Sequence, residues 1–176
     1  PDDALGLRDK AIILLCFAGA FRRSELVGMN AEDLEFKEEG LLIQLPFTKT
    51  GEDDVRGVVW GQFSQTCPIQ APRAWLTFAE ITEGPVFVQV RKGGNITDKR
   101  LKAQSVAQIL KRRIAPLGWE INDFAGHSFR RGWLTTAAKS GVSLKEMMSH
   151  AGQKTPSVTL NYIELVELLR NSPSGK

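Results

Sequence analysis

The chain has 176 residues, enough for one domain with a substantial buried core. Hydrophobic residues make up 42% and charged residues 24%, as in ordinary globular proteins. No apolar run approaches the ~20 residues of a membrane-spanning helix. Two cysteines and two histidines at unrelated spacings fit neither a disulfide framework nor a standard zinc site. We therefore expect a cytoplasmic protein without membrane association, structural metal or cofactor.

The formal net charge of +3 is unevenly distributed along the chain. Residues 91–131 contain ten lysines and arginines but only three acidic residues, so this segment carries +7 and the remainder carries −4. Such asymmetry favours an anionic partner on one face, although solvated lysines on helices are an alternative interpretation. The residues expected to meet phosphate groups are Lys99, Arg100, Lys102, Lys111, Arg112 and Arg113.

The first part of the chain combines helical and strand patterns. Apolar residues at helical spacing predict a helix over 5–21, and a second short helix is expected over 24–28. Three strands are then predicted, at 34–36, 41–48 and 55–62. The polar, glycine-containing segment 49–54 is typical of a hairpin turn between the last two strands.

The rest of the chain is predicted to be mainly helical, with an extended segment at 85–90 and a polar loop over 91–100. The expected helices cover 68–81, 104–117, 128–140, 144–150 and 155–170. Residues 171–176 are expected to form a disordered tail. The predicted fold class is α+β, mainly α-helical with a small antiparallel sheet near the N-terminus.

Five side chains, in this order along the chain, together suit attack on a phosphodiester: Arg22, Lys49, His127, Arg130 and Tyr162. A tyrosine phenol can act as the nucleophile, and this chain has a single tyrosine. Arginine forks neutralise charge that builds on a phosphate in the transition state. Lysine and histidine can transfer protons. A structural role remains the alternative for each residue taken alone.

The local sequences around these residues resemble the catalytic domain of the tyrosine recombinases, the phage-integrase family. Residues 19–26 resemble the family's first arginine box, residues 127–130 match its H-x-x-R box, and residues 155–162 resemble its nucleophile box. Lys49 stands where the family carries a lysine in a β-hairpin turn. Each motif is weak alone, but all of them in order, over residues 5–169, make a specific signal.

The resemblance implies a tyrosine recombinase catalytic-domain fold over residues 1–170, with the family's N-terminal core-binding (clamp) domain expected to be absent from this chain. It also implies cleavage and rejoining of double-stranded DNA through a 3′-phosphotyrosyl intermediate, without metal or ATP. The implied assembly is a homo-tetramer on DNA and a monomer when free, in the cytoplasm and associated with the nucleoid. The apolar residues expected to pack on a neighbouring protomer, or else on their own domain, are Leu165, Val166, Leu168 and Leu169.

Two residues near these boxes carry further hypotheses. Gln153 lies nine residues before Tyr162, where the family usually has a histidine or tryptophan that donates a hydrogen bond to the scissile phosphate. The Gln153 amide is a donor and can substitute, in a site that we expect to be slow. Glu25, three residues after Arg22, is expected to orient that arginine from behind.

Two other functions use the same residues. A type IB topoisomerase shares the chemistry but lets the released strand swivel before resealing. A catalytically impaired, integrase-derived DNA-binding module keeps the DNA contacts alone, and the departure at Gln153 favours it.

Overall fold

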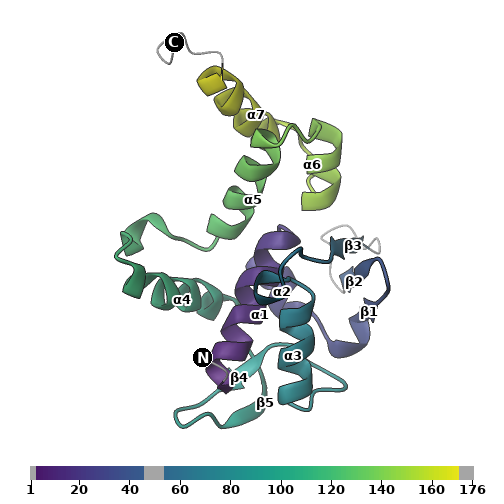
Figure 1. Ribbon diagram of the computed structural model, residues 1–176, viewed down its shortest axis with the longest axis vertical. Coiled ribbons are helices and arrows are strands. Elements are labelled where there is room, and N and C mark those ends of the chain that lie inside the picture. Colours follow the sequence, from purple (N-terminus) through teal and green to yellow (C-terminus); the bar gives the residue numbers. More distant parts are fainter. Residues whose placement is uncertain (1–2, 46–53, 171–176) are drawn as a thin grey trace.

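In the computed structural model, residues 3–45 and 54–170 are described, with only the backbone for 169 and 170. The helices are α1 (Ala4–Ala18), α2 (Arg23–Gly28), α3 (Gln70–Phe78), α4 (Ala103–Ile114), α5 (Ser128–Lys139), α6 (Leu144–Ala151) and α7 (Ser157–Arg170). The strands are β1 (Leu34–Phe36), β2 (Gly40–Leu45), β3 (Asp54–Val59), β4 (Val88–Val90) and β5 (Ile96–Arg100). The α+β fold class, mainly helical, is confirmed (Figure 1).

A larger hydrophobic core lies in the lower part of Figure 1, where α1 packs against α3 and α4. Its largest fully buried side chains include Trp75, Phe21 and Phe87. The indole N–H of Trp75 donates to the carbonyl of Val86 at 2.7 Å, so the aromatic ring is buried without losing its hydrogen bond. This core therefore holds most of the largest fully buried side chains of the described residues.

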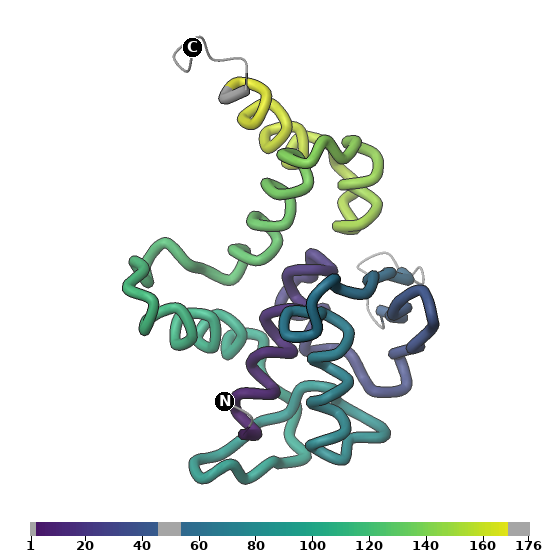
Figure 2. The backbone as a smooth tube through the Cα atoms, in the orientation of Figure 1, coloured from purple at the N-terminus to yellow at the C-terminus, as the bar shows by residue number. Residues whose placement is uncertain are grey.

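A smaller second core joins α5, α6 and α7 at the top of Figure 1. Its buried members are Ala20, Leu134, Ala137, Ala138, Met147, Ala151 and Val166. Figure 2 shows how the chain leaves α4, turns through residues 115–127 and then rises as α5. Four of its seven buried members are alanines, and α5 also reaches the first core, where Phe129 is buried.

The β1-β2-β3 sheet is antiparallel, and β2 pairs with β3 from Gly40 opposite Val59 to Leu45 opposite Asp54. The last part of the expected strand, residues 46–48, lies outside the described residues. The hairpin β4–β5 was not expected, because 91–100 was predicted to be a loop. Gly93 and Gly94, both with positive φ, turn the chain there, and the polar strand β5 lacks the apolar alternation by which strands are recognised.

A buried carboxylate fastens α4 to α1. Asp9 has no exposed surface and pairs with the guanidinium groups of Arg8, Arg112 and Arg113 at 2.8, 2.7 and 2.9 Å. Breaking a pair that is buried on both sides, such as Arg8 with Asp9, typically costs about 3–5 kcal/mol, because the remaining charge stays buried without compensation. Two of the arginines that were expected to meet phosphate, Arg112 and Arg113, therefore stabilise the fold. Within the described residues, no helix is both long and apolar enough to cross a bilayer.

Candidate active site

The two cores meet where four side chains donate hydrogen bonds to backbone carbonyls at helix ends. At the C-terminal end of α1, the Ala18 carbonyl is 2.7 Å from His150 Nε2, and two residues later the Ala20 carbonyl accepts from Arg130 Nη1 at 2.9 Å. The last carbonyls of a helix have no partner within it and carry partial negative charge. Cationic and imidazole donors therefore stabilise this end of α1.

The C-terminal end of α6 is held in the same way from the opposite direction. Arg56 Nη1 donates to the His150 carbonyl at 2.6 Å, and Arg22 Nη2 donates to the Gly152 carbonyl at 3.5 Å. Gly152 adopts a left-handed conformation with φ of 55°, and a side chain there would collide with the Arg56 guanidinium. The two helix ends thus gather Arg22, Arg56 and Arg130 around the turn between α6 and α7.

Arg130 has the most informative environment of the three. Its side chain is buried, and its Nη2 is the one buried side-chain nitrogen or oxygen of the described residues that has no hydrogen-bond partner. Burial, followed by the nearby charge of Arg22, lowers the pKa of Arg130 to about 10. The group is therefore still charged at neutral pH. A buried, charged nitrogen without a partner is costly unless an anion meets it.

Arg22 lies at the start of α2 and is about half exposed, so it can reach solvent or a ligand. Its guanidinium pairs with the Glu25 carboxylate, which also accepts from the Arg22 backbone N–H at 2.7 Å. This places Glu25 where it can orient Arg22. The adjacent Arg23 instead lies against the backbone of Gly126, where a side chain would collide with its guanidinium.

His127 takes no part in these bonds to helix ends. His127 stands exposed at the residue before α5, and its side chain forms no hydrogen bond with the described residues. Arg130, three residues later, turns into the protein, so no hydrogen bond joins the two side chains. Lys49 lies outside the described residues, and its role stays a prediction.

Gln153 lies in the turn between α6 and α7, and Tyr162 lies on α7. Tyr162 is half-buried on α7 and packs against the second core, and its hydroxyl has no hydrogen-bond partner among the described residues. Gln153 follows α6, and its backbone N–H donates to the Met148 carbonyl at 2.9 Å. The side-chain oxygen of Gln153 accepts from the Thr159 hydroxyl. The nucleophile candidate is thus free, whereas the Gln153 amide is partly held.

Arg56 is the residue of this site that the sequence analysis missed. It lies on β3, buried, and pairs with Asp54 at 2.6 Å, which lowers the pKa of the Asp54 carboxyl. In a strand, alternate residues face the same side, so Arg56 shares the inward face of Val58. An arginine on the core face of a predicted strand was a readable signal that it bonds to something inside the protein.

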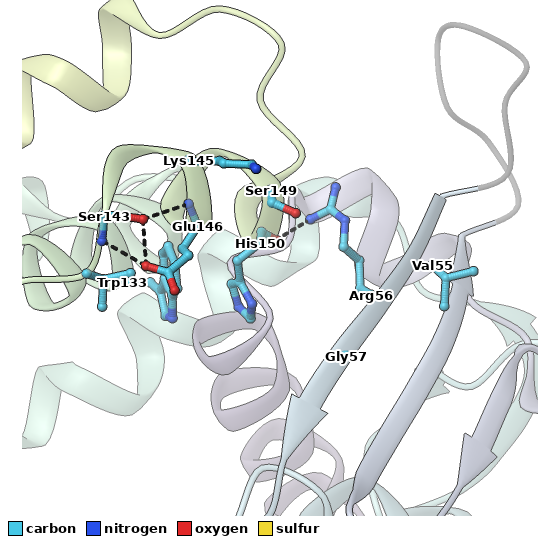
Figure 3. A pocket seen from close by; sticks show the side chains of 10 residues that line it. Val55, Arg56, Gly57, Trp133, Ser143, Lys145, Glu146, Ser149 and His150 are labelled. Carbon is cyan, nitrogen blue, oxygen red and sulfur yellow. Dashed lines mark hydrogen bonds between the residues drawn. The ribbon is translucent and has the colours of Figure 1, made fainter.

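Beside Arg56, a cleft of about 800 Å³ separates β3 from α5 and α6 (Figure 3). In Figure 3 the Arg56 side chain extends from β3 toward the end of α6. The His150 ring stacks on Trp133 with ring centroids 4.3 Å apart. The Ser143 hydroxyl at the start of α6 accepts from the Glu146 backbone N–H at 3.3 Å, a capping contact that begins this helix.

The predicted phosphate-contacting residues fall into two groups. Lys99 and Lys102 are exposed and Lys111 is half-buried. Arg100 donates to the carbonyls of Val27 and Met29 at 2.7 and 3.1 Å, while Arg112 and Arg113 pair with Asp9. Arg112 nevertheless keeps 54% of its side chain exposed, which leaves it accessible to a ligand.

Comparison with protein families decides the relationship. The model of the phage integrase family matches residues 1–167. The chain belongs to the phage integrase family. This confirms the resemblance drawn from the arginine, H-x-x-R and nucleophile boxes.

Two curated relatives of this family member are named as recombinases. It is 35% identical over 170 residues to an integrase/recombinase XerD homolog of Selenomonas ruminantium, covering 95% of this chain and 50% of the relative. It is 27% identical to the tyrosine recombinase XerC of Syntrophus aciditrophicus, covering 92% and 50% of the two chains. The integrase-family chain thus spans about half the length of these relatives.

Solved structures show the same fold. The XerH site-specific recombinase bound to palindromic difH substrate, in a post-cleavage complex, aligns with a TM-score of 0.75 at 15% identity, covering 98% of this chain and 47% of that one. The Tn1549 transposon integrase in complex with transposon right end DNA aligns with a TM-score of 0.61 at 18% identity, covering 92% and 58%. The predicted tyrosine recombinase catalytic-domain fold is confirmed.

We expect His150 to make the free energy of unfolding depend on pH. Its pKa is lowered from 6.5, first by burial and then by Arg56 and Arg130, although the bond to Ala18 acts in the opposite direction. Because the unfolded histidine binds a proton more readily than the folded one, the free energy of unfolding should fall as pH drops from about 7 through 6.5, and level off below the folded pKa.

Urea unfolding across this pH range tests the expectation. His150→Gln keeps an N–H donor for the Ala18 carbonyl but cannot titrate, so its stability should depend less on pH than that of the wild type. His127→Gln, a change at the exposed histidine, is the matched control and should keep the wild-type slope. An unchanged slope in His150→Gln would contradict the assignment.

Proposed function

We propose that this chain is the catalytic domain of a site-specific DNA recombinase that cuts and rejoins strands through a covalent phosphotyrosyl link. The observation that carries the proposal is the charged Arg130 side chain, buried with Nη2 unpaired and close enough to Arg22 for their charges to interact. Two guanidinium groups so placed suit the non-bridging oxygens of one phosphate. The named relatives XerD homolog and XerC support the same function.

The chemistry follows from these groups. The Tyr162 oxygen attacks phosphorus, the bond to the 5′ oxygen breaks, and the phosphate becomes linked to tyrosine at the 3′ end of the DNA. Lys49 gives a proton to the leaving 5′ oxygen as general acid, and His127 accepts the phenol proton or binds a phosphate oxygen. A 5′ hydroxyl of the partner duplex then attacks phosphorus and gives its proton to Lys49, while the bond to the Tyr162 oxygen breaks and this oxygen regains its proton.

Each half of this reaction exchanges one phosphodiester for another, so the bond energy is retained and no ATP is required. The charge that grows on the phosphate is met by Arg22 and Arg130, with Glu25 orienting the former. Gln153 contributes its amide N–H group where the family usually has a histidine or tryptophan donor. One neutral amide donor in this place is consistent with a functional but slow site.

Covalent trapping tests the nucleophile. The wild-type protein, mixed with a duplex library of random sequence that is nicked so that cleavage releases a short fragment, should form SDS-resistant protein–DNA adducts. Tyr162→Phe should form none, because it lacks the attacking oxygen while its ring still packs on the second core. Adducts that persist in Tyr162→Phe would contradict the assignment.

The same assay separates the rival functions. Binding without adducts in the wild type would indicate the catalytically impaired module. Relaxation of supercoiled DNA by the wild type, without recombinant products, would indicate a type IB topoisomerase. Sequencing of the trapped DNA would identify the target site.

We propose further that Lys99, Lys102 and Lys111 bind the DNA backbone, with Arg112 adding a contact beyond its bond to Asp9. Lys99, Lys102 and Lys111 changed together to glutamine should weaken binding to every duplex. The dependence of log K on log salt should also become flatter, by about 0.9 for each phosphate that the protein no longer neutralises. Lys37→Gln is the control, because Lys37 already pairs with Glu35 at 2.8 Å.

In this experiment an unchanged salt slope would contradict the proposed phosphate binding. Arg113→Gln should behave differently from the lysine changes. It removes a partner of buried Asp9, and its main effect should be a lower free energy of unfolding.

Strand exchange between two duplexes needs four active sites, so we propose a homo-tetramer on DNA and a monomer in its absence, in the cytoplasm at the nucleoid. Val166 packs within the second core, whereas Leu165 and Leu168 expose 52% and 70% of their surface and are available to a neighbouring protomer. Leu165→Ser with Leu168→Ser should leave folding intact and abolish the tetramer in sedimentation velocity with target DNA. An unaltered DNA-bound assembly would exclude this interface.

A further inference from the structure

Several hydrogen bonds hold the backbone around Gln153 in place. Gly152 ends α6 in the left-handed conformation, and the Gln153 N–H reaches back to the Met148 carbonyl at 2.9 Å. Arg56 and Arg22 bond to the carbonyls of His150 and Gly152, immediately before it. The Cα of Gln153 therefore has a defined place beside the arginines, and what remains to be set is the direction of its side-chain amide.

That direction matters because the two ends of an amide are opposite in character. The NH₂ group donates hydrogen bonds, whereas the carbonyl oxygen only accepts them. Phosphate oxygens accept and do not donate when ionised, so an amide turned the wrong way would present its negative end to the substrate. An indole N–H at this position would have no acceptor end to misplace, whereas a glutamine needs a neighbour that selects one orientation.

Thr159 is that neighbour. It lies on the first turns of α7, has no exposed surface, and its hydroxyl donates to the Gln153 side-chain oxygen. The NH₂ group of Gln153 then has no partner among the described residues and stays available. We propose that Thr159 is a positioning residue, which fixes the Gln153 amide with its NH₂ group toward the scissile phosphate. The inference rests on the proposed recombinase function and deepens it.

The physical reason is the cost of an unpaired acceptor. With threonine, the productive orientation satisfies both ends of the amide, the oxygen by the hydroxyl and the nitrogen by phosphate. With valine, which has nearly the same shape, that orientation leaves the amide oxygen beside a buried methyl group without a donor. The amide then loses its preference for the productive orientation.

Single-turnover rates of covalent adduct formation, on the duplex recovered by trapping, test the inference. Thr159→Val should slow adduct formation about tenfold, the scale of one hydrogen bond removed from the transition state. Thr159→Ser should restore the rate, since it restores the hydroxyl. Thr77→Val is the matched control, because Thr77 is an exposed threonine on α3, outside the three boxes, and the change should leave the rate unchanged.

The decisive comparison repeats Thr159→Val in a Gln153→Ala background. If Thr159 acts through the amide, Thr159→Val should not slow adduct formation further in the Gln153→Ala background, although the single and double variants are both slow. An equal loss in both backgrounds would show a merely structural role and overturn the inference. If the wild type itself forms no adduct, the proposed function fails, and the inference falls with it for a separate reason.

Discussion

The junction between the two hydrophobic cores depends on side chains that donate to the carbonyls of helix ends. His150 bonds to the last carbonyl of α1 and Arg130 to the carbonyl of Ala20 just beyond it, while Arg56 and Arg22 bond to the carbonyls at the end of α6. Helix C-termini attract such donors because their last carbonyls have no partner in the helix. The second core is small and rich in alanine, and these polar contacts join it to the first together with Phe129 of α5, which is buried in the first core.

The same contacts create a site suited to an anion. To satisfy carbonyls on two helices, three guanidinium groups must come close together, which is unfavourable without an anion. Asp54 neutralises Arg56 and Glu25 neutralises Arg22, but Arg130 keeps one nitrogen unpaired. A phosphate placed there would supply the missing acceptor. The hydrogen bonds to the helix ends and the unpaired nitrogen of Arg130 therefore belong to one arrangement, which joins residues from β3, α2 and α5.

Several features could be predicted from the sequence because they depend on local order. The strand at 34–36 and the start of the helix at Ser128 were located from periodicity, and the family was recognised from motifs separated by domain-scale distances. The hairpin β4–β5 was missed, since a polar strand held by backbone bonds and two glycines has little pattern of its own. Arg56 was missed because its partner, the His150 carbonyl, lies 94 residues away.

The order of residue types was sufficient to indicate the family, the helical fold class and the candidates Arg22, His127, Arg130, Gln153 and Tyr162. The chemistry of a side chain depends on its residue type, so candidate catalytic groups can be identified from the sequence. Tertiary structure alone decided which groups have partners. It showed that Arg112 and Arg113 serve buried Asp9, that Arg130 lacks one acceptor, and that Thr159 meets Gln153. Hydrogen bonds and burial arise between distant segments, and no local pattern encodes them.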